Sequence, residues 1–383
     1  MVSNKKEGEC ALSRRRFGKK NEIKIDPLNY NICLLGEPKI GKTTIIKEML
    51  EKLAGDDGYI FLEMAGESGA DAISNIIFED VDDWGYLEEI IEDIEYNKTT
   101  HYPNLRAIVV DTFDGWIELA QEEAIRMWNI ENPDKRATSI DAAWGGFQRG
   151  QAKAFDLMFD IMKRLRKVNV ATIVIGHVRS RDLTDVASGE TYRTLTSDVE
   201  KVYFNLLKKK MHFLGLAYYD RTIITEKTGK KNIVTKKDIT VNKIVDESRK
   251  IKFRDDNMAL DSGSRFADIV PEVAFDVDEL IKALNDAIKK EAEKGTKPVE
   301  QLKKEQEQAE LEKVKKIAKA EEEKKKQREL DEVINKITDY IKANKSDLDK
   351  VKPILEKCKE FGVDNPTQLT DIKQAKEVLK IAR

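Results

Sequence analysis

The sequence contains few of the features that would place the protein in an oxidising compartment or in a membrane. It has three cysteines among 383 residues, Cys10, Cys33 and Cys358, and no two of them have C-x-x-C spacing. Isolated cysteines argue for a reducing, cytosolic setting without a disulfide framework or a zinc site. No apolar stretch is long enough to span a bilayer, and the N-terminus lacks the apolar segment of a signal peptide. We therefore expect a cytoplasmic protein with no membrane partner.

The sequence also lacks a strong net charge. Its 68 lysines and arginines and 71 aspartates and glutamates leave a formal charge of −3, which excludes a globally basic nucleic-acid binder. Any surface for nucleic acid must therefore be local. Apolar residues, at 40%, are enough for a core, whereas charged residues, at 36%, exceed the usual share of about 25%. The excess lies near the C-terminus, and the length predicts two domains or one domain with an appendage.

The strongest functional signal is the pattern G-x-x-x-x-G-K-T at residues 36–43, the Walker A or P-loop motif. The apolar run 32–35 precedes it, as a buried strand would, and apolar residues follow it at helical spacing. This strand–loop–helix context favours a phosphate-binding loop over a chance glycine turn. The residues expected to contact the nucleotide are Gly36, Glu37, Pro38, Lys39, Ile40, Gly41, Lys42, Thr43 and Thr44.

The residue types in this loop have physical roles. Gly36 and Gly41 let the backbone curl until its N–H groups point at phosphate oxygens. The helix that starts near Lys42 adds the positive end of its dipole. Lys42 would reach the β- and γ-phosphates, and the Thr43 hydroxyl would bind Mg²⁺. The sequence therefore predicts ATP and Mg²⁺ as ligands.

Two later apolar runs also end in a polar residue. The run 106–112 closes with Asp111, a Walker B pattern, and an aspartate beside the P-loop can hold Mg²⁺ through its water shell. The run 170–177 closes with His177, which either senses the γ-phosphate or the attacking water or is satisfied in a strand-end turn. Strands are expected at 30–35, 59–62, 106–112 and 170–177, and helices at 84–96, 113–128 and 147–168.

Four strands that end at polar residues and alternate with helices resemble the RecA-like P-loop ATPases, an α/β class with a mainly parallel sheet. More narrowly, the sequence is similar to phage-encoded RecA-like ATP-binding proteins, a group that includes single-strand annealing ATPases. The likeness covers about residues 28–290, and the segments that carry it are 36–44, 109–112, 145–147, 172–177 and 261–266. It implies ATP binding, Mg²⁺-dependent hydrolysis, single-stranded DNA binding, assembly into rings or filaments and, for a phage protein, the host cell cytoplasm.

One departure from this family concerns the glutamate that usually follows the second strand and polarises the attacking water. Residues 61–67 read F-L-E-M-A-G-E, and the register falls cleanly on neither Glu63 nor Glu67. Glu67 lies beyond the strand end, so we expect it to be catalytic together with Lys42 and His177. If neither carboxylate reaches the water, hydrolysis will be slow and the protein will act mainly as an ATP switch.

Several basic residues are candidates for contacts with DNA or with the nucleotide of a neighbouring subunit. Local basic segments occur at 208–210, in an expected hairpin turn at 227–231, and in an alternating strand at 248–254, where an ordinary solvated face is the alternative. The segment 180–196 is polar and is expected to be a flexible loop. The individual candidates are Arg179, Arg181, Arg249, Lys250 and Arg254, with Arg249 or Lys250 acting in trans.

Composition divides the chain into four parts. Residues 1–22 form a basic arm that is either disordered or contacts phosphates, and 23–294 form the ATPase core. Residues 295–329 are rich in Glu, Lys and Gln with favourable i,i+4 pairs but no sustained heptad, which predicts a solvated helical linker. Residues 330–383 predict a small domain of three helices, the second opened by Pro353.

These features favour an ATPase that acts on single-stranded DNA in phage recombination or replication, as a homo-oligomer. A rival interpretation is a nucleotide-dependent regulatory or assembly protein, in which the small C-terminal domain binds a protein partner, such as a replication or recombination protein. A small-molecule kinase is disfavoured because the sequence shows no evident lid or acceptor pocket.

Overall fold

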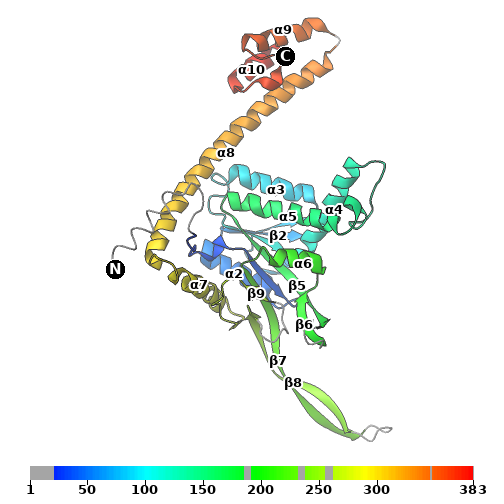
Figure 1. The fold of residues 1–383 in the computed structure, drawn as a ribbon, viewed down its shortest axis with the longest axis vertical. Coiled ribbons are helices and arrows are strands. Elements are labelled where there is room, and N and C mark those ends of the chain that lie inside the picture. The colour runs from blue at the N-terminus through cyan, green and yellow to red at the C-terminus, as the bar shows by residue number, and fades with distance from the viewer. Residues whose placement is uncertain (1–20, 185–190, 232–237, 255–261, 346, 383) are drawn as a thin grey trace.

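The structure is a computed structural model that describes residues 21–184, 191–231, 238–254, 262–345 and 347–382. It is a mixed α/β fold built on a mostly parallel central sheet, as the sequence predicts (Figure 1). The strands run in the order β10-β8-β7-β1-β5-β4-β2-β3. Their bounds are β1 Ile32–Gly36, β2 Tyr59–Met64, β3 Phe78–Val81, β4 Ala107–Asp111, β5 Ala171–Thr184, β7 Phe213–Lys231, β8 Asp238–Lys252 and β10 Glu272–Ala274.

The six strands from β7 to β3 are parallel, whereas β8 and β10 add an antiparallel edge. Strand β5 lies between β1 and β4, with Gly36 in register with His177 and Glu63 in register with Asp111. Because the carboxyl ends of parallel strands meet at one edge of a sheet, these residues gather at the same edge. The topology therefore assembles one site from segments far apart in the sequence.

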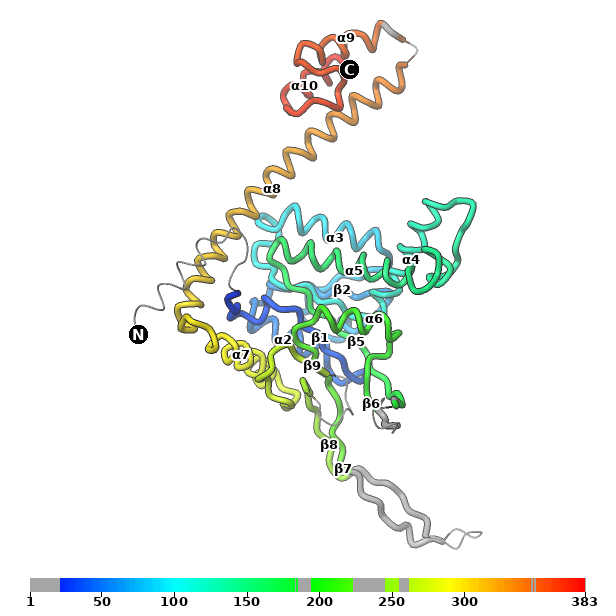
Figure 2. Tube along the Cα trace, in the orientation of Figure 1, coloured from blue at the N-terminus to red at the C-terminus, as the bar shows by residue number. Residues whose placement is uncertain are grey.

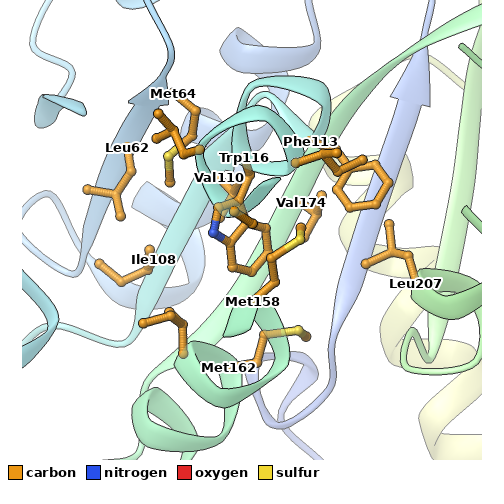
Figure 3. Close-up of a cluster of buried hydrophobic side chains, with 14 of the residues drawn as sticks. Leu62, Met64, Ile108, Val110, Phe113, Trp116, Met158, Met162, Val174 and Leu207 are labelled. Atoms are coloured by element: carbon orange, nitrogen blue, oxygen red, sulfur yellow. The ribbon is translucent and has the colours of Figure 1, made fainter. Parts of the chain in front are cut away.

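Helices cover both faces of the sheet. One face carries α3 (Trp84–Asn97), α4 (Phe113–Glu131), α5 (Arg149–Lys167) and α6 (Lys201–Lys208), and the other carries α2 (Lys42–Ala54) and α7 (Val277–Glu293). Strand residues alternate between the two cores, so Ile108 and Val110 face α4 and α5 while Val109 faces α2. Figure 3 shows the first core, where Trp116 lies among side chains from the strands and α5.

The segment after His177 differs from its predicted structure. Residues 180–196 are not simply a loop, because β5 continues to Thr184 and pairs antiparallel with β6 (Thr191–Ser197). The predicted basic hairpin is confirmed, but its turn does not lie at 227–231, since β7 continues to Lys231 and pairs with β8. The coloured part of β7 and β8 in Figure 2 leads away from the sheet. Both segments are mostly polar, so the sequence offers too little hydrophobic contrast to place these strands.

The edge strands β3, β9 (Gly263–Ser264) and β10 were not expected. They are two to four residues long, so pairing with a neighbour, rather than their own pattern, defines them. Short single-turn helices η1 (Pro27–Asn29), η2 (Ala70–Ala72), η3 (Ala143–Gly145) and η4 (Pro366–Gln368) occur in the connections. Of the predicted arm at 1–22, only residues 21 and 22 lie within the described residues.

A single helix, α8 (Val299–Ala343), runs from the core to the C-terminal unit (Figure 1). The predicted boundary between residues 329 and 330 falls inside it. Beyond it, α9 (Leu348–Glu360) and α10 (Ile372–Ile381) pack on its last turns around a separate apolar cluster that includes Ile337 and Ile354. Pro353 lies inside α9 and does not open it, because the backbone turns helical after Asp347.

The first two thirds of α8 are not solvated all round. Leu302 is buried, and the Gln306 side chain bonds to the backbone of Ile23 and Ile25. Farther along, the carboxylate of Glu321, 4% exposed, accepts a 2.8 Å hydrogen bond from the Thr99 N–H and another from its hydroxyl. These contacts fasten the helix to the core before it projects outward.

Among the described helices, none combines the length and the apolar character needed to cross a bilayer.

Candidate nucleotide-binding site

The P-loop leaves the carboxyl end of β1 and enters α2, whose first residue is Lys42. Gly41 precedes the helix with a φ of 103°, a conformation in which a side chain is strained. A Cβ on Gly36 would lie 2.9 Å from the Cβ of Ala217 on β7, closer than carbon atoms approach. Both glycines of the motif are therefore required by the backbone path itself.

The Lys42 side chain folds back over the loop. Its Nζ donates hydrogen bonds of 3.1 Å to the carbonyls of Gly36 and Glu37 and lies 3.3 Å from Nδ1 of His177. Burial lowers the pKa of Lys42, and the carboxylates of Asp111 and Glu67 oppose that shift. The ammonium group is thus held at the sheet edge by carbonyls that a phosphate could replace as its partner.

Thr43 and Asp111 form the second part of the site. The Thr43 hydroxyl donates a 2.8 Å hydrogen bond to Oδ2 of Asp111, which is 3% exposed at the end of β4. Burial raises the pKa of Asp111, while the hydrogen bond from Thr43 lowers it. The predicted Walker A and Walker B residues therefore meet, although 68 positions separate them in the sequence.

The two glutamates considered for water activation differ in their surroundings. Glu63 is 2% exposed, its Oε1 accepts a 2.5 Å hydrogen bond from the Ala70 N–H, and its Oε2 is buried without a hydrogen-bond partner among the described residues. Burial raises the pKa of Glu63. Glu67 follows Gly66, is half-buried, and acts electrostatically on both Lys42 and Asp111. Both carboxylates lie near the site, but only Glu63 is fixed by a hydrogen bond.

Two further acids near Lys42 were missed by the sequence analysis. Asp114, in the first turn of α4, and Asp198, after β6, both raise the pKa of Lys42. The Asp198 N–H donates to the carbonyl of His177, and burial together with Asp114 raises the pKa of Asp198. Asp114 lies in the first turn of the helix that directly follows the Walker B strand, a position that could have revealed it. Asp198 had no such signal, because it reaches the site through the unexpected β5–β6 hairpin.

Two of the predicted basic residues, Arg249 and Lys250, make contacts within the chain. Arg249 donates a 2.9 Å hydrogen bond to the carbonyl of Ile40 in its own P-loop. Lys250 pairs with Asp220 and Glu272. A role of either residue at the nucleotide of a neighbouring subunit stays a prediction.

The remaining candidates also have structural partners, with one exception. Arg254 bonds to the carbonyl of Ala267. Arg181 donates to the carbonyls of Ser197, Asp198 and Val199, which holds the turn between β6 and α6. Arg179 is exposed on β5, two residues beyond His177. Among these five arginines and lysines, Arg179 is the one whose exposed position best suits a contact with another molecule.

With this geometry in place, the chain can be compared with known proteins. A family model described as an AAA domain matches residues 28–243, just over half of the chain. The chain belongs to the AAA domain family. The match spans the P-loop, Asp111 and His177, and it supports the coarser part of the predicted resemblance, a P-loop ATPase that uses a nucleotide.

The other comparisons add little to this AAA domain assignment. A crystal structure of the RadB recombinase matches with 13% identity and a TM-score of 0.26, covering 56% of this chain and 86% of its own. A TM-score this low carries no argument about the fold or the function. Among curated proteins, none matches the sequence.

Proposed function

We propose that this AAA domain protein binds ATP, hydrolyses it with Mg²⁺, and acts on single-stranded DNA. The observation that carries the proposal is the convergence of Lys42, Thr43, Asp111 and His177 at the carboxyl edge of three adjacent strands, with Lys42 Nζ 3.3 Å from His177 and Thr43 bonded to Asp111. A phosphate-binding loop, a hydroxyl–carboxylate pair and a polar strand end are the parts that phosphoryl transfer requires.

The donor set fits Mg²⁺. This ion prefers oxygen ligands and is usually bound by one or two carboxylates together with substrate phosphates. Thr43 and Asp111 offer a hydroxyl and a buried carboxylate in contact, and the orphaned Oε2 of Glu63 lies at the same strand ends. Among the described residues no group of three or more His, Cys, Asp or Glu side chains could hold a metal, so phosphate oxygens would have to complete the coordination at this site. When bound, Mg²⁺ would neutralise charge on the β- and γ-phosphates.

The protein groups have separate tasks in this mechanism. The P-loop N–H groups and the start of α2 bind the phosphates, and the Lys42 ammonium exchanges its carbonyl partners for phosphate oxygens. Glu67 orients the water for in-line attack, because it is half-buried and close enough to act on Lys42 and Asp111. Glu63 positions the 65–70 turn through its bond to Ala70. His177 touches Lys42 and therefore responds when the γ-phosphate leaves.

The DNA part of the proposal is supported by strand β5. It connects His177, at the nucleotide site, to the exposed Arg179 and then to the β5–β6 hairpin. A strand is stiff along its length, so a contact made by Arg179 would affect the position of His177. The association into a homo-oligomer is part of the same proposal, and it predicts that specific activity rises with protein concentration.

The regulatory or assembly role stays a second candidate because of the C-terminal unit. It has its own apolar core and stands at the end of a 45-residue helix, away from the nucleotide site (Figure 1). In that role ATP sets the conformation, and a replication or recombination protein binds the unit.

Steady-state ATP hydrolysis, measured with and without single-stranded DNA beside Lys42→Ala, tests the proposal. We expect DNA to stimulate the wild-type rate and Lys42→Ala to abolish both rates while keeping a wild-type circular dichroism spectrum. ATP binding without any DNA response would instead favour the regulatory role, and an unchanged rate in Lys42→Ala would overturn the assignment of the site.

A further inference from the structure

Five basic side chains lie together at the edge of the sheet opposite the nucleotide site. We name them the basal patch: Lys163 and Arg166 on α5, Lys209 and Lys210 after α6, and Arg265 after β9. Asn31 shows where the patch lies relative to β1. This residue directly precedes β1, and its side-chain amide donates a 3.0 Å hydrogen bond to the Lys210 carbonyl. The P-loop leaves the other end of β1, a strand of five residues that spans about 16 Å.

Contacts among its members show that the patch is continuous. Arg265 donates from its side chain to the Lys209 carbonyl and from its backbone to the His212 carbonyl. Arg265 and Arg166 both lower the pKa of His212, so both lie near its ring. Lys210 Nζ and Lys163 Nζ stand 3.8 and 4.5 Å from the centre of the same ring, that of Phe159.

The basal patch is short of negative partners. Other basic groups of the core do have such partners, for example Arg164 with Glu88 and Glu95. Among the described residues, no member of the patch forms an ion pair, and Arg166, which is half-buried, has only the Asn29 carbonyl as a hydrogen-bond acceptor. Glu22 and Glu291 line the same pocket as Arg166 and Arg265, and the exposed Asp160 precedes Lys163 by one turn of α5.

Unpaired cations held in one place on a protein of net charge −3 attract a partner with repeated negative charge. Phe159 adds an aromatic ring close to two ammonium groups. This pairing of cations with an aromatic ring is suited to a single-stranded nucleic acid, whose phosphates and bases it can contact together. We propose that the basal patch binds the phosphate backbone of single-stranded DNA. The inference rests on the proposed function for its partner, but the surface is separate from the nucleotide site.

The basic segments noted in the sequence differ in whether their side chains already have partners in the structure. Residues 249–252 are engaged by Ile40 and by carboxylates, and Arg254 by Ala267. The side chains at 227–231 lie outside the described residues. The segment 208–210 is the one that contributes two members to an unpaired surface. DNA held there would leave the carboxyl edge of the sheet free for ATP.

The experiment compares two triple variants of the full chain. Lys163→Gln with Lys209→Gln and Lys210→Gln removes three of the five positive charges of the patch and leaves Arg166 and the bonds made by Arg265 in place. The control is Lys315→Gln with Lys316→Gln and Lys319→Gln, three exposed lysines of α8 without ion pairs among the described residues. Both variants change the net charge equally. Anisotropy of a fluorescein-labelled oligo(dT) of about 30 nucleotides gives affinity against salt, and a fluorescent ADP analogue reports the nucleotide site.

We expect the patch variant to lose at least about tenfold in oligonucleotide affinity and to reduce the slope of log affinity against log salt by about 2, since each single-strand phosphate contact contributes about 0.7. ADP affinity should stay unchanged, and the control should bind like wild type. Equal loss in both variants, or wild-type binding by the patch variant, would overturn the patch while leaving the proposed function intact. Wild-type protein that binds ADP but no oligonucleotide would overturn both DNA proposals and point to an acidic protein partner.

Discussion

Nζ of Lys42 and Nδ1 of His177 lie 3.3 Å apart, although 135 positions separate the two residues in the sequence. The contact arises because β5 pairs in parallel with β1 and brings His177 level with Gly36. Lys42 is the group that would hold the γ-phosphate, so His177 is placed to sense that phosphate under the proposed function. The same strand continues to the surface at Arg179, so the proposed DNA contact would lie two residues from His177.

This arrangement predicts that His177→Ala keeps nucleotide binding but loses the stimulation of hydrolysis by DNA. We expect the affinity for a fluorescent ADP analogue to stay within about threefold, because the P-loop is intact. The DNA-stimulated hydrolysis rate should fall by about 10²-fold, as after removal of one positioned polar group at a reacting centre. Steady-state hydrolysis with and without oligo(dT) measures the effect, and equal losses with and without DNA would show that His177 does not couple the two sites.

The two glutamates give a second prediction. Glu67→Gln should lower the hydrolysis rate by about 10²–10⁴-fold, the contribution of a positioned base, and leave ADP binding unchanged. Glu63→Gln should cost less than about tenfold, because the amide oxygen of glutamine can still accept the hydrogen bond from Ala70. Single-turnover hydrolysis of ATP separates the variants. The reverse order of effects would assign the water to Glu63.

The parts of this site that the sequence predicted are those fixed by local pattern. The P-loop and Asp111 each follow an apolar run directly, so strand, turn and polar end are contiguous in the sequence. Asp198 and the α8 contacts were missed because long-range packing creates them. Glu321 lies in a run of lysines and glutamates that reads as fully solvated, yet it is buried against Thr99. Periodicity cannot show which charged residue of such a run meets the core.

Glu321 therefore supplies a third prediction, about the attachment of α8. Glu321→Ala removes the acceptor of the Thr99 N–H and hydroxyl, and an orphaned buried donor costs about 1–3 kcal/mol. We expect faster amide hydrogen exchange over the middle of α8, with little change in the core strands. Glu322→Ala is the matched control, because its side chain is 68% exposed and pairs only with Lys326. Similar exchange in both variants would refute the role of Glu321.

His212 supplies the last prediction, a dependence of stability on pH. Burial, with Arg265 and Arg166 nearby, lowers the pKa of His212 from 6.5 to about 4. Its Nδ1 accepts a 3.1 Å hydrogen bond from the Asn31 N–H, which requires the ring to be neutral at that nitrogen. Between these two pKa values the unfolded chain binds a proton that the folded chain does not. The free energy of unfolding therefore falls as the pH drops from about 6.5 towards 4.

Carboxylates also titrate in this window, so the test is a comparison with His212→Gln. Glutamine can accept the Asn31 hydrogen bond through its side-chain oxygen, but it carries no proton that titrates. Urea unfolding of both proteins at several pH values between 7 and 5 gives the difference in their stability curves. The variant also loses the ring contact between Tyr30 and His212, and this loss offsets its stability by a similar amount at each pH. We expect the wild type to lose more stability than His212→Gln as the pH falls. Parallel curves would mean that His212 takes up its proton equally well in the folded protein, which would be incompatible with its burial between two arginines.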